Sequence, residues 1–424
     1  MCWAGLPRMP NMESKALRSI LKYYDTGNGE LLVGGTPISR LAERHGTPLY
    51  VYDLSVARTK YQRLRASLPP EIEVHYAIKA NPHPEIVKFF LDLGAGFDVA
   101  SMGELRTVVS IGADSEQCGF AGPGKGINEL EYAIELGIGA LNVESYRELE
   151  LAGQIAERLG TKANVSLRIN PAFHLRGAGV RIGGGAHAFG IDQEQIPGVL
   201  TRIAGMKHLN FAGFHLFAGS QNLKPEPLIE FFTLSFGLLK ELLNYCPKAP
   251  KLINLGGGFG IPYLAKDEEL DIELVGQGLR KLVTQYRPVF PEARFSVESG
   301  RYLIGEAGVY VARVRYRKTS RGETFLVTDG GLHHHLAATG NFGQVIQRNY
   351  PIALLQKLEM PDVERVNIVG PLCTPLDILG AGVDLPEAAE GDLIGIFASG
   401  AYGFSASPRG FLSHPEPMEI VAGM

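Results

Sequence analysis

The most constraining feature of this chain is an alternation, between residues 48 and about 300, of short apolar runs with longer amphipathic stretches. The apolar runs have the length and alternation of strands, whereas stretches such as INELEYAIELG and YRELELAGQIAERLG have helical spacing. The pattern repeats eight times, so we predict an α/β protein built on a (β/α)8, TIM-like barrel. The candidate strands are residues 74–80, 94–100, 118–122, 140–145, 164–170, 211–217, 252–258 and 294–300.

The pattern changes after about residue 304. The runs VYVARVRYRKTSRGETFLVTDGG, RVNIVG and DLIGIFASGAY alternate with period two and contain few helical segments, which is typical of antiparallel sheet. GELLVGG, ahead of the barrel, is expected to join them. We therefore predict a barrel over residues 47–303 and a C-terminal antiparallel domain over 304–424, sandwich-like or barrel-like, joined by the N-terminal segment 12–46.

Composition narrows the function classes. With 45% hydrophobic and 20% charged residues the chain is globular, and a net charge of −4 favours no nucleic-acid or membrane partner. Its four cysteines are widely spaced without a CxxC pair, so a disulfide framework is not expected. No stretch resembles a signal peptide or a membrane span. We expect a cytoplasmic protein.

Lys79 ends the first candidate strand, in the motif HYAIKANP. The Asn-Pro pair that follows takes the chain out of regular structure, and barrel active sites lie at the carboxyl ends of the strands. A lysine there is either a solvated strand end or a nucleophilic amine on a rigid element. The side chains expected at the same edge are Asp98, Asn170, His215, Phe217, Gly256 to Gly258 and Glu298.

A glycine run, NLGGGFG, directly follows the seventh candidate strand. Consecutive glycines allow backbone N–H groups to converge on an anion, although tight turns use the same residues. The run does not match the dinucleotide pattern, because Ile261 stands where the third glycine is required. It therefore favours a small phosphorylated group over NAD.

The motif VESGR ends the eighth candidate strand with Glu298, Gly300 and Arg301. A carboxylate in an apolar barrel mouth is costly unless it meets a cation. Either Arg301 pairs with Glu298, or Glu298 serves a protonated ring nitrogen of a cofactor.

Two further segments carry aromatic side chains at candidate ligand positions. In GFHLFAGSQ, His215 and Phe217 share one face of a strand and either pack in the core or form a platform for a planar ligand. In SGAYGFS, Tyr402 stands between glycines, which suits a hydroxyl directed at a ligand.

The segment GPLCTPLD places Cys373 and Asp377 in a loop bracketed by prolines. A free thiol is commonly buried and inert, but this position near an acid is compatible with proton transfer. The run LHHHLA invites a metal interpretation. Three successive strand residues cannot all face one centre, so we predict no metal site.

A lysine, a phosphate nest, an acid for a ring nitrogen, an aromatic platform and a thiol together indicate pyridoxal 5′-phosphate. On these residues the chain resembles the alanine-racemase-fold decarboxylases, the family of diaminopimelate and ornithine decarboxylases, from about residue 30 to 420. The motifs HYAIKANP, GFDVAS, GSQ, LGGGFG, ESGR, GPLC and GAYGFS occur in the order of that family.

The resemblance implies a role for each motif. Lys79 would form the internal aldimine, Glu298 would pair with the pyridine nitrogen, and Cys373 would be the proton donor, reaching across from the partner subunit of a homodimer with shared active sites. The stacking histidine of the family aligns with Phe217, and His215 stands two residues earlier, so either ring is a candidate. The implied cofactor contacts are Asp98, His215, Phe217, Ser220, Gly257, Gly258, Gly300, Arg301 and Tyr402, and the implied substrate contacts are Arg301, Thr374, Asp377 and Tyr402.

Two departures from the family concern the substrate. Diaminopimelate decarboxylases carry an arginine and a tyrosine after DGG, but the stretch DGGLHHHLAATGNFGQ contains no arginine. Relatives place an acid for the distal ammonium after the cysteine, where this chain has Thr374. The variants ESGRYL, DGGLHHH, GPLCTPLD and FLSHPEP resemble two narrower groups, the glutamyl-[acyl-carrier-protein] decarboxylase of butirosin biosynthesis and the exosortase-associated pyridoxal-dependent decarboxylases.

We therefore predict decarboxylation of an α-amino acid with a conjugated or carrier-tethered side chain, with free diaminopimelate, ornithine or lysine as the alternative substrates. The amine would displace Lys79, CO2 would leave as the ring takes up the electrons in a quinonoid, and Cys373 would return a proton to Cα. A racemase of this fold sets an arginine against the ring nitrogen, so Glu298 argues against that activity. A regulator that only binds partners typically lacks parts of the catalytic set, whereas Lys79, Glu298 and Cys373 are all present.

Overall fold

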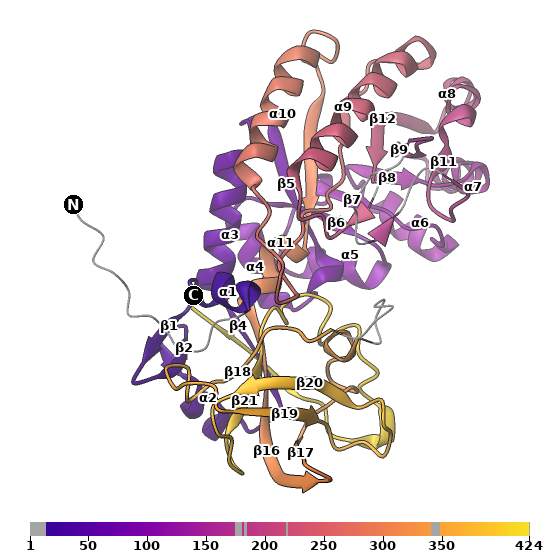
Figure 1. Ribbon diagram of the computed structural model, residues 1–424. Coiled ribbons are helices and arrows are strands. Elements are labelled where there is room, and N and C mark those ends of the chain that lie inside the picture. Colours follow the sequence, from indigo (N-terminus) through magenta and orange to yellow (C-terminus); the bar gives the residue numbers. More distant parts are fainter. Residues whose placement is uncertain (1–13, 174–179, 182–184, 218, 341–347, 424) are drawn as a thin grey trace. The chain divides into compact units, whose positions relative to one another are not determined.

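The computed structural model describes residues 14–173, 180–181, 185–217, 219–340 and 348–423 (Figure 1). The chain divides into two compact units, each with its own core. The barrel unit comprises residues 60–260 and 270–302, and the β unit comprises residues 1–59, 261–269 and 303–424. Within the described residues, no helix has the length and apolar character that crossing a membrane requires.

The barrel unit is a closed ring of parallel strands that follow one another in chain order. Pairing between β8 and β9 and between β15 and β5 closes the ring, and the short strand β11 (Ile191–Asp192) adds to β9. All eight candidate strands of the sequence are ring strands, which confirms the predicted barrel. They are β5 (Ile72–Ala77), β6 (Gly96–Val99), β7 (Cys118–Phe120), β8 (Ala140–Val143), β9 (Ala163–Asn170), β12 (Leu209–Leu216), β14 (Leu252–Asn254) and β15 (Arg294–Ser299).

Three of the helices that follow the strands begin at capping side chains. Ser101, Ser145 and Asp271 each accept a hydrogen bond from the backbone N–H group three residues further on, which satisfies a donor that has no partner inside the helix. The apolar faces of the helices are buried, as their spacing predicts. The helices are α3 (Leu54–Ser67), α4 (Pro84–Asp92), α5 (Met102–Ser110), α6 (Ile127–Glu135), α7 (Tyr146–Arg158), α8 (Ile196–Ala204), α9 (Pro225–Leu242), α10 (Ile272–Tyr286) and α11 (Arg301–Ile304).

The β unit contains a mostly antiparallel sheet. The long strand β16 (Gly308–Ser320) is its centre, because its first half pairs with β4 (Leu49–Asp53) and β21 (Leu393–Ile396) and its second half with β17 (Glu323–Thr328). The remaining strands of this sheet are β18 (Ile352–Leu354), β19 (Glu364–Val369), β20 (Ile378–Leu385) and β22 (Met418–Ala422). The helices α1 (Lys15–Leu21) and α2 (Ile38–His45) belong to the same unit.

Three details of the β unit differ from the simplest sequence expectation. β4 lies within the range 47–303 assigned to the barrel, but it pairs with β16 and β22. GELLVGG lies in the β unit with the C-terminal strands, but outside the large sheet; it supplies β2 (Glu30–Val33), which pairs with β1 (Asp25–Gly27) and β3 (Thr36–Pro37). The pairs β17–β19 and β22–β4 are parallel. The pairing of β4 with β16 and the two parallel pairs depend on partner strands that are distant in sequence.

Candidate active site

Lys79 lies just past the carboxyl end of β5, in the single turn η1 (Ile78–Ala80). Its Nζ atom is 2.7 Å from Oδ2 of Asp98, which lies on the neighbouring strand β6. The Asp98 side chain is buried, whereas that of Lys79 is 40% exposed. The end of β5 thus positions an amine that contacts a buried carboxylate and is still accessible to a ligand. A nucleophilic lysine requires both properties.

Glu298 and His215 meet at the same end of the barrel. Oε1 of Glu298, on β15, lies 2.8 Å from Nε2 of His215, on β12. Asn254, which ends β14, donates from Nδ2 to the same oxygen at 2.8 Å. Glu298 and His215 are both buried. Because Oε1 takes part in both hydrogen bonds, Oε2 of Glu298 can accept a hydrogen bond from another donor.

The electrostatics of the two buried acids differ. Burial alone would raise the pKa of Glu298, but His215, Lys79 and Arg168 hold that pKa below its usual range. Burial, followed by the charge of Glu298, raises the pKa of Asp98, and Lys79 only partly offsets that rise. Glu298 is therefore the fixed anion of the site, whereas the charge of Asp98 depends on its lysine.

The glycine run after β14 forms a tight loop that tolerates no side chain. A Cβ atom on Gly257 would lie 1.9 Å from the backbone oxygen of Glu298, and one on Gly258 would lie 2.7 Å from the backbone oxygen of Gly219. Gly258 has φ +103°, a conformation that disfavours other residues. The backbone oxygen of Gly258 also accepts from Asn222, so this loop lies against the segment that carries Ser220.

Gly300 connects the ESGR motif to the segment of Lys79. A Cβ atom at Gly300 would lie 2.7 Å from Cβ of Ala80 and 2.9 Å from the backbone oxygen of Ala77, so only glycine fits. Arg301 follows at the start of α11 and is half-buried. The structure therefore brings Lys79, Asp98, His215, Glu298 and the glycines of two motifs together at one end of the barrel.

Sequence reasoning missed a second buried ion pair in the barrel unit. Arg168, on β9, is 2.7 Å from Glu144, which follows β8, and both side chains are buried. The guanidinium of Arg168 lies 5.9 Å from the ring centre of Phe217 and 5.0 Å from that of Phe189. An arginine inside the apolar strand NVSLRIN was the available signal, because a buried charge needs a partner.

Phe217 and His215 thus occupy different places. His215 is buried and engaged with Glu298, whereas Phe217 is half-buried and lies near the Arg168 guanidinium. Of the two candidates for the platform, His215 is held by its hydrogen bond to Glu298, whereas Phe217 makes no such bond.

Cys373 and Asp377 lie in the loop that follows β19 in the β unit. Cys373 is exposed, whereas Asp377 is buried. Oδ1 of Asp377 accepts from the Leu332 N–H at 2.6 Å and Oδ2 accepts from the Leu372 N–H at 2.8 Å. Burial raises the pKa of Asp377, and these two amides oppose the rise. Asp377 therefore fastens the cysteine loop to the segment after DGG.

Thr374 and Tyr402 are the other predicted site residues of the β unit. Oγ1 of Thr374 accepts from the Leu376 N–H at 3.3 Å, within the cysteine loop. Tyr402 is half-buried and has φ +59°, a left-handed conformation that is uncommon for a tyrosine and is typically found at functional sites.

The three successive histidines of the β unit are buried. Burial lowers the pKa of His333 to about 3, that of His334 to about 4 and that of His335 to about 3. His334 and His335 have hydrogen-bonded partners in Pro415 and Ser399. The described residues contain no group of three or more His, Cys, Asp or Glu side chains arranged for a metal ion.

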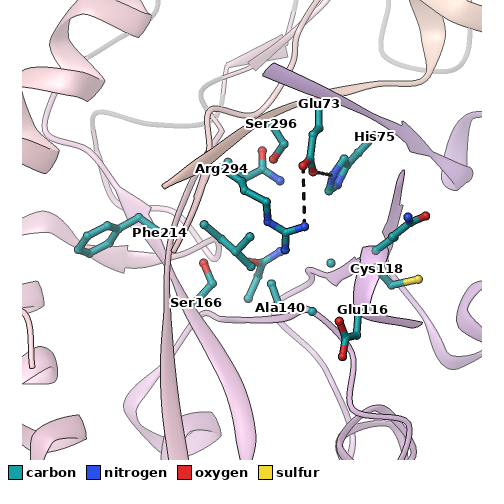
Figure 2. A pocket seen from close by; sticks show the side chains of 15 residues that line it. Glu73, His75, Glu116, Cys118, Ala140, Ser166, Phe214, Arg294 and Ser296 are labelled. Carbon is teal, nitrogen blue, oxygen red and sulfur yellow. Dashed lines mark ion pairs between the residues drawn. The ribbon is translucent and has the colours of Figure 1, made fainter. Parts of the chain in front are cut away.

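The opposite end of the barrel holds a small polar cavity (Figure 2). Glu73 there lies 3.6 Å from His75 and 3.8 Å from Arg294. The polar side chains Asn142, Ser166, Asn254 and Ser296 also line the cavity. Asn254 therefore contacts Glu298 on one side and this cavity on the other.

The residues at the carboxyl end of the barrel fit pyridoxal phosphate. Nδ1 of His215 and Oδ1 of Asp98 are buried without a hydrogen-bond partner among the described residues. Glu298 is held as an anion with one oxygen available, as a protonated ring nitrogen requires. The loop of Gly257 and Gly258 leaves no room for a Cβ atom, so its backbone stays free of side chains, as a backbone anion cradle requires. When bound, the cofactor supplies an electron sink for the carbanion left by departing CO2.

Comparison with known proteins identifies the family. Residues 54–305 match the family of pyridoxal-dependent decarboxylases, pyridoxal binding domain. The L-glutamyl-[BtrI acyl-carrier protein] decarboxylase of Niallia circulans is 38% identical over 388 residues, which cover 91% of this chain and 90% of that protein. The 2-[(L-alanin-3-ylcarbamoyl)methyl]-2-hydroxybutanedioate decarboxylase of Staphylococcus aureus is 29% identical, with coverages of 89% and 94%. A crystal structure of diaminopimelate decarboxylase from M. jannaschii has a TM-score of 0.87 at 27% identity, with coverages of 95% and 93%.

The barrel, the mostly antiparallel second unit and the lysine–carboxylate site together define an enzyme of the alanine-racemase fold. The chain belongs to the pyridoxal-dependent decarboxylases. The predicted family, fold class, cofactor and enzyme class are thereby confirmed.

Proposed function

We propose that the chain decarboxylates an α-amino acid whose side chain is conjugated or tethered to a carrier protein. The observation that carries this proposal is that the carboxylate of Asp377 already has its hydrogen-bond partners within the protein. It is the acid of the cysteine loop, and both of its oxygens already accept backbone N–H groups. It therefore offers no ready partner for the distal ammonium of a dibasic amino acid.

Among the described residues, the cysteine loop and residues 332–340 offer no other charge for such a substrate. Thr374 is uncharged, and His333 to His335 are neutral at physiological pH because burial lowers their pKa values. Residues 332–340 contain no arginine, and residues 341–344, which complete the predicted stretch, lie outside the described residues. A buried charge without a partner costs about 2–5 kcal/mol. A neutral or conjugated distal group avoids that cost.

The names of two relatives support this substrate class. The Niallia circulans protein is named for a glutamyl group on an acyl carrier protein, and the Staphylococcus aureus protein for an alanyl group joined through a carbamoyl linkage. Both names describe an amino acid whose side chain is extended by a further group.

We assign the following roles to the residues of this chain. The Lys79 amine would hold the cofactor until the substrate amine replaces it, and Asp98 orients Lys79. The Glu298 carboxylate would hold the proton on the ring nitrogen, and His215 and Asn254 orient that carboxylate. Cys373 donates a proton from Sγ to the substrate Cα after CO2 has left.

The remaining assignments concern binding. Gly257, Gly258 and Gly300 provide the backbone cradle for the phosphate, and Phe217 provides the ring platform. We assign Ser220, Arg301 and Tyr402 to the phosphate, and Arg301, Tyr402 and Thr374 to the substrate. We assign Asp377 a structural role in the cysteine loop, because both of its oxygens accept backbone N–H groups, and its contact with substrate stays an untested prediction.

The substrate proposal is tested with a panel that contains free diaminopimelate, lysine and ornithine beside glutamyl thioesters of pantetheine and of a purified acyl carrier protein. Release of CO2 is measured at steady state. We expect a conjugated substrate to exceed every free dibasic amino acid in kcat/KM. Turnover of free diaminopimelate or ornithine at about 10⁴ M⁻¹s⁻¹ or better would refute the proposal and establish the alternative of a free amino-acid decarboxylase.

The role of Cys373 has its own test. Cys373→Ala should lower kcat by about 10²- to 10⁴-fold, and misplaced protonation should give transamination products. Asp377→Ala is the informative companion variant, because it keeps the thiol and removes two loop hydrogen bonds. It should reduce kcat less and change the alkylation rate of Cys373. Clean amine formation at full rate by Cys373→Ala would contradict the assignment.

We also propose a homodimer in which Lys79 and Cys373 of different subunits serve one active site. The two residues belong to different units of the chain, Lys79 to the barrel unit and Cys373 to the β unit. If subunits exchange, a mixture of Lys79→Ala and Cys373→Ala proteins should recover activity at about a quarter of the sites. Persistent inactivity after verified exchange would indicate that each subunit is self-contained. A cytoplasmic location remains a prediction.

A further inference from the structure

A hairpin of the β unit carries a concentration of positive charge that the proposed catalytic roles do not use. Its strands are the second half of β16 and all of β17, which pair from Val314 opposite Thr328 to Ser320 opposite Glu323. Residues 315–323 are all exposed. Residues 313–322, RVRYRKTSRG, contain five basic residues and no acidic one, although the chain has a net charge of −4. We call residues 313–322 the basic hairpin.

Two of the five cations have partners within the β unit. Arg317 forms a bidentate pair with Glu364, at 2.8 and 2.6 Å, and Arg313 donates to the backbone oxygen of Gly391. Arg315, Lys318 and Arg321 form no ion pair among the described residues. These three cations are therefore available to a partner.

Folding of the β unit does not explain these residues. A fully exposed strand end buries little apolar surface, and neighbouring like charges on a hairpin are destabilising. Tyr316, which lies among the three cations, is 64% exposed. Tyrosine and arginine are enriched where proteins bind one another, and a positive patch steers an acidic partner toward its binding site.

The position of the basic hairpin relates it to the cysteine loop. β17 runs from the tip of the hairpin to Asp329, and its parallel neighbour β19 runs the same way and leads to Cys373. Six residues of strand span about 20 Å. A partner bound at the tip would therefore lie about one strand length from the Cys373 loop, a separation that a long flexible tether can cross.

We propose that the basic hairpin is the docking surface for the acidic face of an acyl carrier protein that presents the tethered substrate. This inference rests on the proposed function. Arg315, Lys318 and Arg321 supply charge complementarity to the carrier, and Tyr316 supplies an apolar contact. Three available cations on an acidic chain form a small patch, which suits a small acidic protein better than the extended backbone of a nucleic acid.

The main test is the charge-reversal variant Arg315→Glu/Lys318→Glu. Its KM for a glutamyl-loaded acyl carrier protein should rise about 10- to 100-fold, because attraction at the docking surface becomes repulsion. Its kcat and KM for the glutamyl thioester of pantetheine should remain unchanged, because that substrate lacks the carrier. The matched control Lys207→Glu/Lys281→Glu makes the same change in net charge on exposed residues of the barrel unit and should leave both KM values unaltered.

A binding measurement makes the test independent of turnover. Calorimetric titration of the enzyme with the unloaded carrier should give an affinity that weakens as salt increases and is lost in the charge-reversal variant. A neutral variant, Arg315→Gln/Lys318→Gln, should have an intermediate affinity. Normal unfolding temperature and normal turnover of the pantetheine thioester show that each variant is folded.

The outcomes separate this inference from the proposed function. If the carrier-linked substrate is turned over and its KM is the same in the wild type and the charge-reversal variant, the docking surface is wrong and the substrate class stands. If no conjugated substrate is turned over, the proposed function fails. In that case the calorimetric titration tests the docking surface by itself. The docking proposal is overturned if the enzyme shows no salt-sensitive binding of the carrier, or if it binds an oligonucleotide in place of the carrier.

Discussion

The two ends of the barrel use the same kinds of charged residue in opposite ways. At the amino end, Glu73 of β5 lies 3.6 and 3.8 Å from His75 and Arg294, and the Glu73 and Arg294 side chains are 45% and 57% exposed. At the carboxyl end, Glu298 lies 2.8 Å from His215, and both side chains are buried. β15 contributes Arg294 to one end and Glu298 to the other, on the same face because strand side chains alternate.

The difference teaches that burial determines what a charged pair does in this fold. The Glu73–Arg294 pair at the amino end is screened by water and contributes little. At the carboxyl end, burial makes every charge depend on its partners, and it shifts the pKa values of Glu298 and Asp98 in opposite directions. We therefore expect the carboxyl end, and not the amino end, to bind and polarise a ligand.

The largest effect is expected at Lys79. Lys79→Ala should abolish turnover and remove the borohydride-reducible attachment of pyridoxal phosphate, because the amine is the nucleophile of the site. Lys79→Arg is the matched control, since it keeps a cation beside Asp98 without an amine that reacts at neutral pH. Absorbance of the bound cofactor and CO2 release are the measurements. An attachment that persists on another lysine would refute the assignment.

Glu298→Gln should lower kcat by about 10²- to 10³-fold. The amide keeps the shape of the side chain and can accept from Asn254, but it cannot balance the charge of a protonated ring nitrogen. The absorption spectrum of the bound cofactor should change together with the rate. A variant with unaltered spectrum and kcat would show that the buried end is no more sensitive than the exposed one.

A smaller effect is expected in the glycine cradle. Gly257→Ala places a Cβ atom 1.9 Å from the backbone oxygen of Glu298, so the loop must shift, at a cost of about 1–3 kcal/mol. We expect weaker binding of pyridoxal phosphate, measured by fluorescence titration of the apoenzyme. Gly124→Ala is the control, because no atom lies within 4 Å of its added Cβ. Equal affinities of the two variants would contradict the cradle.

The smallest effect is expected at the amino end. Glu73→Gln removes the carboxylate that contacts His75 and Arg294, but exposed pairs of this kind contribute less than about 1 kcal/mol. The unfolding temperature should change by no more than a few degrees, and kcat should be unchanged. A large loss of activity would show that the cavity in Figure 2 is coupled to Glu298 through Asn254, and the contrast between the two ends would no longer hold.

The sequence by itself determined the barrel strands and the residues proposed to carry out the chemistry. The eight barrel strands follow from local alternation, and Lys79, Glu298 and the glycine run could be placed at the carboxyl end because each directly follows or ends a strand. Asp98 could be selected on the same ground. These inferences need only the period of a strand and the rule that barrel sites lie at one edge.

The tertiary structure decided which side chains meet. The contact of Asn254 with Glu298, the Arg168–Glu144 pair and the amides that hold Asp377 join residues on different segments. β4 likewise pairs with β16 and not with the barrel strands. Local sequence could not predict this pairing, because β16 lies more than 250 residues later in the chain. Local patterns state what a segment can bury, whereas register and partner are set by packing between distant segments. The tertiary structure also decided the direction of each pKa shift, because that direction depends on burial and on neighbouring charges.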